Sequence, residues 1–315
     1  MTIDKKFIDQ FIKVSSKAAL ASSYLIGKKN KNAADQAAVD SMRSELNKID
    51  MTAEVVIGEG TLDEAPMLYT GEILGTKSGP IFDIAVDPVE GTNFVANNLP
   101  GGIAVLAIAE KGNLFKAPET YMSKIATCKI EKGLIDLDYS LEKNIKHLSD
   151  FKNKEISSIT VCIMDRPRHK KIIDKLKDLN VNIKLITDGD ILGALYVSDP
   201  KYKVDMYLGI GGGPEGVIAA SALDVFDCHF QGRFIFDNDK CIKEAKKMGI
   251  TDLDKKYELN EIIKGDSIFC ATGITKGDVL SGIKIENDNY TSETLVTHKK
   301  SRLKKIVKKI DNISK

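Results

Sequence analysis

Carboxylates follow two segments that have the pattern of buried strands. Glu59 comes just after residues 54–57, and Asp87 and Glu90 come just after residues 81–86. In an open α/β sheet, ligands collect beyond the carboxyl ends of the strands. Carboxylates that converge there repel each other and have raised pKa values unless a cation neutralises them. Because carboxylate oxygens suit Mg²⁺ or Mn²⁺, and these ions also bind phosphate oxygens, the spacing predicts metal-assisted phosphate chemistry.

The segment that contains Asp87 and Glu90 adds groups suited to a phosphate ester. Its sequence reads Asp87-Pro88-Val89-Glu90-Gly91-Thr92-Asn93. An isolated D-P-x-E would only stabilise a turn and the start of a helix. Here Gly91 lets the backbone approach a ligand closely, and Thr92 stands where a helix can begin with free backbone N–H groups. The run thus offers metal ligands, phosphate-binding amides and a hydroxyl able to orient a water.

The elements expected around these residues alternate between helix and strand. Helices are expected at residues 4–24, 33–49 and 169–179, with a further helix from residue 217. Strands are expected at residues 54–57, 81–86, 103–109, 158–163, 183–186 and 205–208. Pro88 is expected to stop the second strand, because proline cannot donate to the ladder. The alternation predicts a layered α/β sandwich.

The composition excludes several other classes of protein. The 46 Lys and Arg residues balance 45 Asp and Glu residues, which argues against a nucleic-acid binder. Residues 1–17 mix charges into their apolar positions and lack the pattern of a signal peptide. No apolar run approaches the roughly 20 residues that cross a bilayer. We therefore expect a cytoplasmic protein with no membrane or nucleic-acid partner.

The cysteines and the C-terminal stretch have simple interpretations. The cysteines are scattered and odd in number, and we expect them to be reduced core thiols rather than a disulfide framework or a zinc site. They are Cys128, Cys162, Cys228, Cys241 and Cys270. Residues 298–315 are basic and amphipathic. We expect a charged helix that packs its apolar side on the body, in preference to one that lies on an anionic membrane.

The run from Asp87 to Thr92 resembles the D-P-[hydrophobic]-D-G-T motif of the lithium-sensitive sugar phosphatases, with Glu90 in the second acidic position. Residues 56–60, 62–69 and 271–278 narrow the resemblance to the class II fructose-1,6-bisphosphatases of bacteria, over about residues 18–305. The resemblance implies a layered αβαβα sandwich of the sugar phosphatase type. It also implies a single domain, with a metal-binding lobe at about 1–145 and a sugar-binding lobe at about 146–315.

The resemblance also implies a metal site for Mn²⁺ or Mg²⁺. Its ligands would be Asp35, Glu59, Asp87, Glu90 and Glu215. By itself, Asp35 would be a favourable charge at a helix N-terminus. Glu215 lies in a glycine run, residues 209–216, that by itself would suggest a dinucleotide loop. The implied catalytic residues are Thr92, which would orient the attacking water, Glu59 and Lys31. The family's acidic residue before Lys31 is replaced by Asn30, a departure that bears on local hydrogen bonding and metal affinity.

The substrate contacts implied by the resemblance come from several parts of the chain. They are Glu90, Gly91, Thr92, Tyr121, Arg166, Pro167, Arg168, Asp188, Gly189, Asp190 and Gly212. Arg166 and Arg168 would clamp the distal phosphate, since a guanidinium donates two parallel hydrogen bonds. By itself that pair would be a solvated basic turn, and residues 188–190 would be a plain turn.

The implied reaction is the metal-dependent hydrolysis of the 1-phosphate of fructose 1,6-bisphosphate to fructose 6-phosphate, in gluconeogenesis. A homo-oligomer, either a dimer or a tetramer, is expected as well. A dual activity on sedoheptulose 1,7-bisphosphate remains open, and so does a non-catalytic sugar-phosphate-binding regulator. An inositol monophosphatase explains two arginines less well, because its substrate has one phosphate. A nucleotide-binding oxidoreductase rests only on the glycine run.

Overall fold

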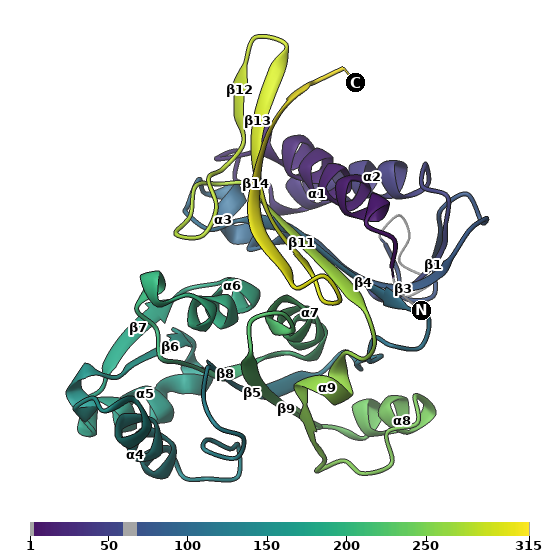
Figure 1. The fold of residues 1–315 in the computed structure, drawn as a ribbon. Coiled ribbons are helices and arrows are strands. Elements are labelled where there is room, and N and C mark those ends of the chain that lie inside the picture. Colours follow the sequence, from purple (N-terminus) through teal and green to yellow (C-terminus); the bar gives the residue numbers. More distant parts are fainter. Residues whose placement is uncertain (1–2, 59–67, 315) are drawn as a thin grey trace. The chain divides into compact units, whose positions relative to one another are not determined.

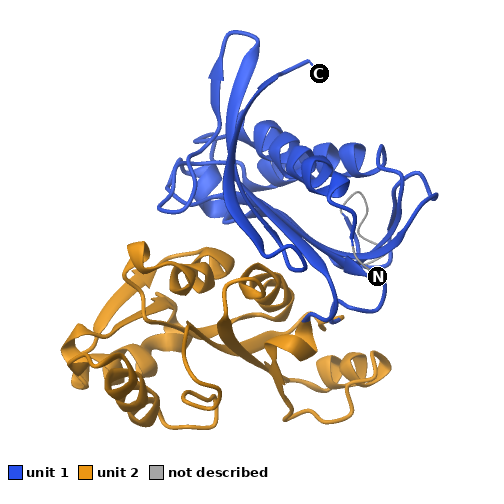
Figure 2. Cartoon of the chain, viewed as in Figure 1, with its two compact units in different colours: residues 1–115, 263–315 blue, residues 116–262 orange. Residues whose placement is uncertain are grey.

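The computed structural model of the chain describes residues 3–58 and 68–314, which form two compact units (Figure 1). Unit 1 comprises Met1–Phe115 and Ile263–Lys315, and unit 2 comprises Lys116–Ile262 (Figure 2). The chain thus leaves unit 1, builds unit 2 and returns. The lobes expected from the sequence were divided near residue 145, whereas unit 2 is an insertion between the two parts of unit 1.

Unit 1 is built on an eight-stranded sheet with the order β12-β13-β11-β4-β3-β1-β2, in which β14 pairs with β13. Its strands are β1 (Thr52–Ile57), β2 (Ile73–Leu74), β3 (Ile81–Glu90), β4 (Ile103–Glu110), β11 (Ser267–Gly273), β12 (Lys284–Glu286), β13 (Asn289–His298) and β14 (Leu303–Asn312). β1 and β3 are parallel, and the other pairs are antiparallel. Every residue of β4 except its last is buried, as the unbroken apolar run predicts.

Helices α1 (Lys6–Ser23) and α2 (Lys31–Leu46) pack on this sheet, and the short helix α3 (Thr92–Ala96) follows β3. The helix expected at residues 4–24 is confirmed as α1. Its apolar residues Phe7, Phe11, Val14 and Ala18, which recur at helical spacing, are all buried. These residues join the apolar core of unit 1 together with residues of β1, β3 and β4. The core thus holds α1 and α2 against the strands that lead to the predicted carboxylates.

The predicted end of the strand before Asp87 is wrong, because β3 continues to Glu90. Asp87 lies opposite Val105 and Glu90 lies opposite Ile103, so the register shifts between them. This irregularity places one extra residue in β3, as in a β-bulge. A proline is tolerated at a bulge because no ladder hydrogen bond is required from its nitrogen. Pro88 therefore lies inside the strand instead of ending it.

The C-terminal stretch is also not the helix that was expected. Its first residue, His298, ends β13, and residues 303–312 form β14, which pairs with β13 along its whole length. A hairpin of this kind satisfies the backbone groups of both strands. Three- to four-residue spacing of apolar side chains in Leu303, Ile306, Val307 and Ile310 imitated a helical stripe. Ile310 is in fact 70% exposed.

Unit 2 is built on a six-stranded sheet with the order β10-β9-β5-β8-β6-β7. Its strands are β5 (Tyr121–Cys128), β6 (Thr160–Met164), β7 (Asn182–Ile186), β8 (Met206–Gly212), β9 (Cys228–Ile235) and β10 (Lys256–Glu258). Its helices are α4 (Leu141–Lys152), α5 (Lys170–Asp178), α6 (Asp190–Leu195), α7 (Gly213–Leu223), α8 (Asp239–Lys247) and α9 (Leu259–Ile262). Short 3₁₀ helices are η1 (Ile156–Ser158), η2 (Pro167–His169), η3 (Tyr196–Ser198) and η4 (Pro200–Tyr202).

The sheet of unit 2 has helices on both faces (Figure 1). α4 and α5 contribute Leu148 and Leu176 to the core on the face that carries Ile125. α6 and α7 contact each other and the strands of the other face, where Gly216 of α7 approaches Met122 and Lys124. Each unit is therefore a layered arrangement of helices and a sheet, and the predicted α/β class is confirmed.

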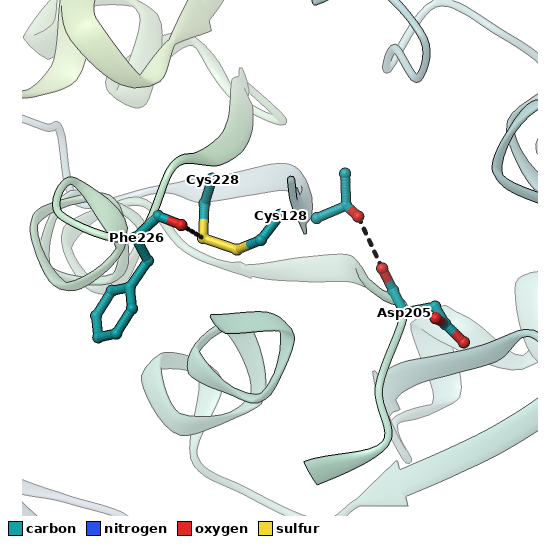
Figure 3. Close-up of a disulfide and its surroundings, with 5 residues drawn as sticks. Cys128, Asp205, Phe226 and Cys228 are labelled. Carbon is teal, nitrogen blue, oxygen red and sulfur yellow. Dashed lines mark hydrogen bonds between the residues drawn. A yellow bond between two sulfur atoms is a disulfide. The ribbon is translucent and has the colours of Figure 1, made fainter. Parts of the chain in front are cut away.

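The expectation of reduced thiols is wrong for two of the five cysteines. Cys128 and Cys228 form a disulfide (Figure 3). They are directly opposite each other on the antiparallel strands β5 and β9, although 100 residues separate them in the sequence. Their spacing along the chain therefore gave no sign of the pair. Cys162 and Cys270 are buried free thiols as expected, and burial raises the pKa of Cys162 to about 12.

Candidate functional site

The corner between β3 and α3 carries four of the predicted site residues, Gly91 among them. Asp87 and Glu90 lie on the last part of β3, and Thr92 begins α3. Between them, Gly91 has a φ of 81°, in the left-handed region that favours glycine. A Cβ on Gly91 would lie 2.8 Å from Cδ2 of Phe94. Glycine is therefore the residue that suits this turn. The turn places Glu90 and Thr92 on either side of one tight corner.

Asp87 also has a structural role at this corner. Its Oδ1 accepts a hydrogen bond of 3.1 Å from the backbone N–H of Val89. This bond stabilises the turn around Pro88, which is what an isolated D-P-x-E would do. A carboxylate has about four lone-pair positions, so the turn leaves capacity for other contacts. The structural and the functional interpretation of Asp87 are compatible.

The first turns of α2 lie beside this corner. α2 contacts both α3 and β3, and the backbone N–H of Gly27 and of Lys29 donate to the carbonyls of Val95 and Ala96, at 2.9 and 2.8 Å. These bonds tie the loop before α2 to the end of α3. Lys31, the first residue of α2, is exposed, whereas Asp35 is one turn later and buried. The loop thereby holds the start of α2 against the Thr92 helix.

Asn30 replaces the acidic residue of the family pattern, but it still makes a hydrogen bond at the start of α2. It is the N-cap of α2, and its Oδ1 accepts a hydrogen bond of 3.0 Å from the backbone N–H of Ala33. Asn and Asp cap helices about equally well. The replacement therefore preserves the start of α2 and removes one negative charge near Lys31.

The donor chemistry of unit 1 fits a hard divalent cation. Asp35 and Glu90 are only 8% and 7% exposed, and with Asp87 they supply oxygen atoms alone. Buried carboxylates of this kind suit Mg²⁺ or Mn²⁺. Glu59 lies outside the described residues, and Glu215 belongs to unit 2. Among the side chains that the structure describes, no group of three or more acidic, histidine or cysteine residues is arranged to hold a metal ion.

In unit 2, three predicted residues line one open pocket of about 360 Å³. They are Tyr121, Gly212 and Glu215. Glu215 lies in the first turn of α7, directly after the glycine run that ends β8. The other lining residues are Glu119, Thr120, Pro214, Asp237, Asn238 and Cys241. The strand-to-helix turn therefore presents Glu215 to the space beside Tyr121.

Glu119 is a residue of this pocket that sequence reasoning missed. Burial of its carboxyl raises the pKa of Glu119, and the negative charges of Glu215 and Glu244 add to the effect. Its position two residues before Tyr121 could have indicated that Glu119 lies near the site. It was missed because it belongs to no recognisable motif. Besides the predicted Glu215, the pocket is thus lined by two further carboxylates, those of Glu119 and Asp237.

The predicted arginines lie in the turn after β6, and the structure brings both to other predicted residues. The Arg166 Nη2 atom lies 3.5 Å from Oδ1 of Asp188. The Arg168 guanidinium lies over the ring of Tyr121, 4.9 Å from its centroid, and its Nε donates a hydrogen bond of 2.8 Å to the carbonyl of Ile210. Both arginines of this turn thus have defined contacts, although Pro167 and Arg168 are exposed to solvent.

The two aspartates of the D-G-D stretch point to different environments. Gly189 has a φ of 84° and precedes α6, so the chain turns between them. Asp188 is partly exposed beside Arg166, whereas Asp190 is buried and its Oδ2 forms an ion pair with Lys124. A Cβ on Gly211 would lie 2.3 Å from that same Oδ2. Part of the glycine run is therefore explained by the space that the buried carboxylate needs.

Known proteins were compared with the chain as a whole. The family model of the bacterial, glpX-encoded fructose-1,6-bisphosphatases matches residues 5–311. A Synechococcus protein, strain JA-2-3B'a(2-13), is 42% identical and is named D-fructose 1,6-bisphosphatase class 2/sedoheptulose 1,7-bisphosphatase; the alignment covers 97% of this chain and 95% of that protein. A Prochlorococcus marinus protein, strain AS9601, has the same name and is 41% identical over 93% of this chain and 92% of its own length.

The solved structures that resemble the chain are more distant. The suhB protein of Bartonella henselae is 13% identical, with a TM-score of 0.35, over 62% of this chain and 73% of that one. The IMPase of Thermotoga maritima is 15% identical, with a TM-score of 0.33, over 63% and 79%. No described helix is both long and apolar enough to span a membrane. From the family match and the close relatives, the chain belongs to the glpX-encoded, class II family of bacterial fructose-1,6-bisphosphatases.

Proposed function

We propose that the chain hydrolyses the 1-phosphate of fructose 1,6-bisphosphate and releases fructose 6-phosphate and inorganic phosphate. The observation that carries the proposal is the cationic turn of unit 2. Arg166 and Arg168 are held beside Asp188 and Tyr121 by an ion pair, a ring contact and a backbone hydrogen bond. Such a turn suits a phosphate group at the far end of a sugar, while the carboxylates serve the ester that is cleaved.

The metal would be held by the predicted carboxylates. Asp35, Glu59, Asp87, Glu90 and Glu215 are the proposed ligands, for Mn²⁺ or Mg²⁺. When bound, a divalent cation polarises the phosphoryl group and stabilises the charge that develops on the leaving oxygen. The oxygen-only donor set of Asp35, Asp87 and Glu90 supports this assignment.

The side chains of the chain itself would orient the reactants. The Thr92 hydroxyl, fixed at the first position of α3, accepts a hydrogen bond from the attacking water and aims it at phosphorus. Lys31 adds a positive charge near the phosphoryl oxygens, and Glu59 is proposed as the group that receives the proton. The Glu90–Thr92 corner contacts the departing phosphate. Placement of this kind contributes through the entropy of positioning rather than through a covalent intermediate.

The sugar and its distal phosphate would contact unit 2. Arg166, Pro167 and Arg168 are assigned to the phosphate, and Asp188 to sugar hydroxyls. Tyr121, Gly189, Asp190 and Gly212 complete the proposed contacts. Because Asp190 is buried against Lys124, we assign its side chain to holding the turn and leave the direct contacts of this stretch to Asp188 and the backbone.

A dual activity on sedoheptulose 1,7-bisphosphate is the second candidate. The relatives at 41–42% identity carry both activities in their names. Both ketose bisphosphates present the same phosphate ester at carbon 1, so the same carboxylate corner serves either. Arg166 and Arg168 would then have to bind a distal phosphate that is one carbon further from the cleaved ester. A non-catalytic regulator is disfavoured, because the predicted acidic set is intact in the sequence.

The remaining expectations stay predictions. They are a single sugar phosphatase domain, a dimer or tetramer, a cytoplasmic location and a role in gluconeogenesis.

Phosphate release from a panel of sugar phosphates tests the proposed function. Fructose 1,6-bisphosphate, sedoheptulose 1,7-bisphosphate and inositol 1-phosphate are each incubated with Mn²⁺, with Mg²⁺ or with a chelator. We expect cleavage of the first, with or without the second, and no cleavage in chelator. Cleavage of inositol 1-phosphate alone, or full activity in chelator, would refute the proposal.

A further inference from the structure

Two neighbouring side chains in unit 2 hold both backbone groups of a single strand residue. The backbone N–H of Ile210 donates to Nε2 of His169 at 2.7 Å, and the carbonyl of Ile210 accepts from Nε of Arg168 at 2.8 Å. In β8, Ile210 pairs with Ser123 of β5 on the other side. The side chains of the 3₁₀ turn thus take the positions that a neighbouring strand would otherwise occupy.

The sheet explains why this position is open to side chains. β6 pairs with β8 only at two positions, the second of them Cys162 opposite Tyr207. Beyond Tyr207, β6 ends at Met164 and the chain enters η2. Ile210 is partly buried, and a backbone group that is left unpaired away from water costs about as much as a lost hydrogen bond. His169 and Arg168 supply the partners of its backbone groups.

The hydrogen bonds also fix the form of the imidazole. Nδ1 of His169 lies 2.7 Å from the carbonyl of Met164, which can only accept, so Nδ1 carries the proton. Nε2 accepts from Ile210 and therefore carries none. The ring is fully buried, and burial lowers the pKa of His169. His169 is therefore a neutral imidazole of one tautomer, and its two hydrogen bonds fix the ring between the end of β6 and β8.

We propose that His169 is a positioning residue for the distal-phosphate clamp, acting through Arg168. This inference rests on the proposed function. Because His169 joins Met164 to Ile210, it sets the distance between the end of β6 and β8, and the Arg168 Nε reaches the Ile210 carbonyl only when that distance is kept. The guanidinium of Arg168 then lies over the ring of Tyr121. His169 itself is buried and does not touch the substrate.

A double-mutant cycle between His169 and Arg168 tests the inference. Steady-state kinetics on fructose 1,6-bisphosphate are measured for the wild type, His169→Gln, Arg168→Ala and the double variant. His169→Gln is expected to raise KM about tenfold and to change kcat less than about threefold, since the lost interaction concerns binding. In the Arg168→Ala background the same substitution is expected to change KM less than about twofold, because the two residues act together.

The matched control is His147→Gln. His147 lies on α4, and its Nδ1 lies 2.7 Å from the carbonyl of Leu134, so the substitution breaks a similar bond elsewhere in the same unit. We expect this variant to have the KM of the wild type.

Each other outcome has a definite meaning. Equal effects of His169→Gln with and without Arg168, or a fall in kcat with KM unchanged, would overturn the positioning role. Loss of a cooperative unfolding transition in His169→Gln would also overturn it, since the histidine would then serve the fold as a whole. A wild-type protein that does not hydrolyse fructose 1,6-bisphosphate would instead refute the proposed function.

Discussion

The ammonium group of Lys124 forms an ion pair with the carboxylate of Asp190 inside unit 2. Lys124 is fully buried in β5, and Asp190 is 6% exposed at the start of α6. Burying two charges costs several kcal/mol per ion before their attraction is counted, so such pairs are uncommon. The glycines of β8 and α7 make room for this one, since Gly211 approaches Asp190 and Gly216 approaches Lys124. The pair thus joins the start of α6, directly after the D-G-D turn, to β5.

Removal of one partner of this pair is expected to destabilise the protein strongly. Lys124→Met leaves the buried carboxylate of Asp190 without its cation, at a cost of about 3–5 kcal/mol in the free energy of unfolding. The double variant Lys124→Met/Asp190→Leu replaces both charges by apolar groups and is expected to recover most of that loss. Urea unfolding measures both values. A single variant as stable as the wild type would contradict a buried, mutually dependent pair.

The turn at Gly91 is expected to tolerate no side chain. Gly91→Ala places a Cβ 2.8 Å from Cδ2 of Phe94 at a φ of 81°, so that either the Phe94 ring or the backbone of the corner must shift. The control is Gly112→Ala, which has a φ of 82° and nothing within 4 Å of the added Cβ. Both substitutions incur about 1–2 kcal/mol of left-handed strain, but only Gly91→Ala is expected to lower kcat/KM. Equal activity of the two variants would show that the corner is not part of the site.

The carboxylates of the β3 corner are expected to matter far more for activity than an exposed acid of unit 1 that is not a proposed ligand. Asp87→Asn and Glu90→Gln are each expected to lower kcat/KM at least about a hundredfold, as for the loss of strong electrostatic stabilisation. Asp40→Asn, an exposed carboxylate on α2, serves as the control and is expected to have no effect. Phosphate release measured over a range of Mg²⁺ and Mn²⁺ concentrations distinguishes weaker metal binding from a slower reaction. Wild-type kinetics in both corner variants would refute the ligand assignment.

The stability of the protein is expected to fall in weak acid, in part through His169. Burial lowers the pKa of His169 below its ordinary value of 6.5; the Arg168 guanidinium acts in the same direction, and the Asp190 carboxylate opposes it. Below that pH the unfolded chain binds a proton at this position while the folded chain resists it, so the free energy of unfolding declines. Burial also lowers the pKa of His229, which contributes in the same sense.

Urea unfolding at about pH 7.5 and about pH 5.5 measures this effect. The decline between the two pH values is expected to be smaller in His169→Gln than in the wild type, because glutamine does not titrate. An equal decline in both proteins would show that His169 is protonated as readily in the folded chain as in the unfolded one.

Local patterns in the sequence were sufficient to predict an element where apolar side chains dominate it. The unbroken apolar run of β4 predicted a buried strand, and the helical spacing of apolar residues in α1 predicted a helix. The first part of the glycine run lies within β8 instead of after the strand. The ion pair of Lys124 with Asp190 could not be predicted, because a lysine within a strand is usually exposed to solvent. The β-bulge at Pro88 was missed since the sequence does not show which residue lies opposite.

Long-range partners account for the other errors. The β14 strand gains its hydrogen bonds from β13, and its own residues carry a spacing that also fits a helix. The Cys128–Cys228 disulfide and the Ile210–His169 hydrogen bond likewise join segments that only the sheet order brings together. Of the candidate site, the residue types were predictable, but the positions of Asp87 and Glu90 were not, because β3 continues through both residues. The ion pair of Asp190 with Lys124 and the hydrogen bonds of His169 became known only from the contacts in the structure.

The identity of the product tests the central claim most directly. The protein is incubated with fructose 1,6-bisphosphate and Mg²⁺ or Mn²⁺, and the products are resolved by phosphorus NMR. The proposed function predicts inorganic phosphate and fructose 6-phosphate in equal amounts, formed only when the metal is present. Fructose 1-phosphate as the product, or an unchanged substrate at every metal concentration, would contradict it.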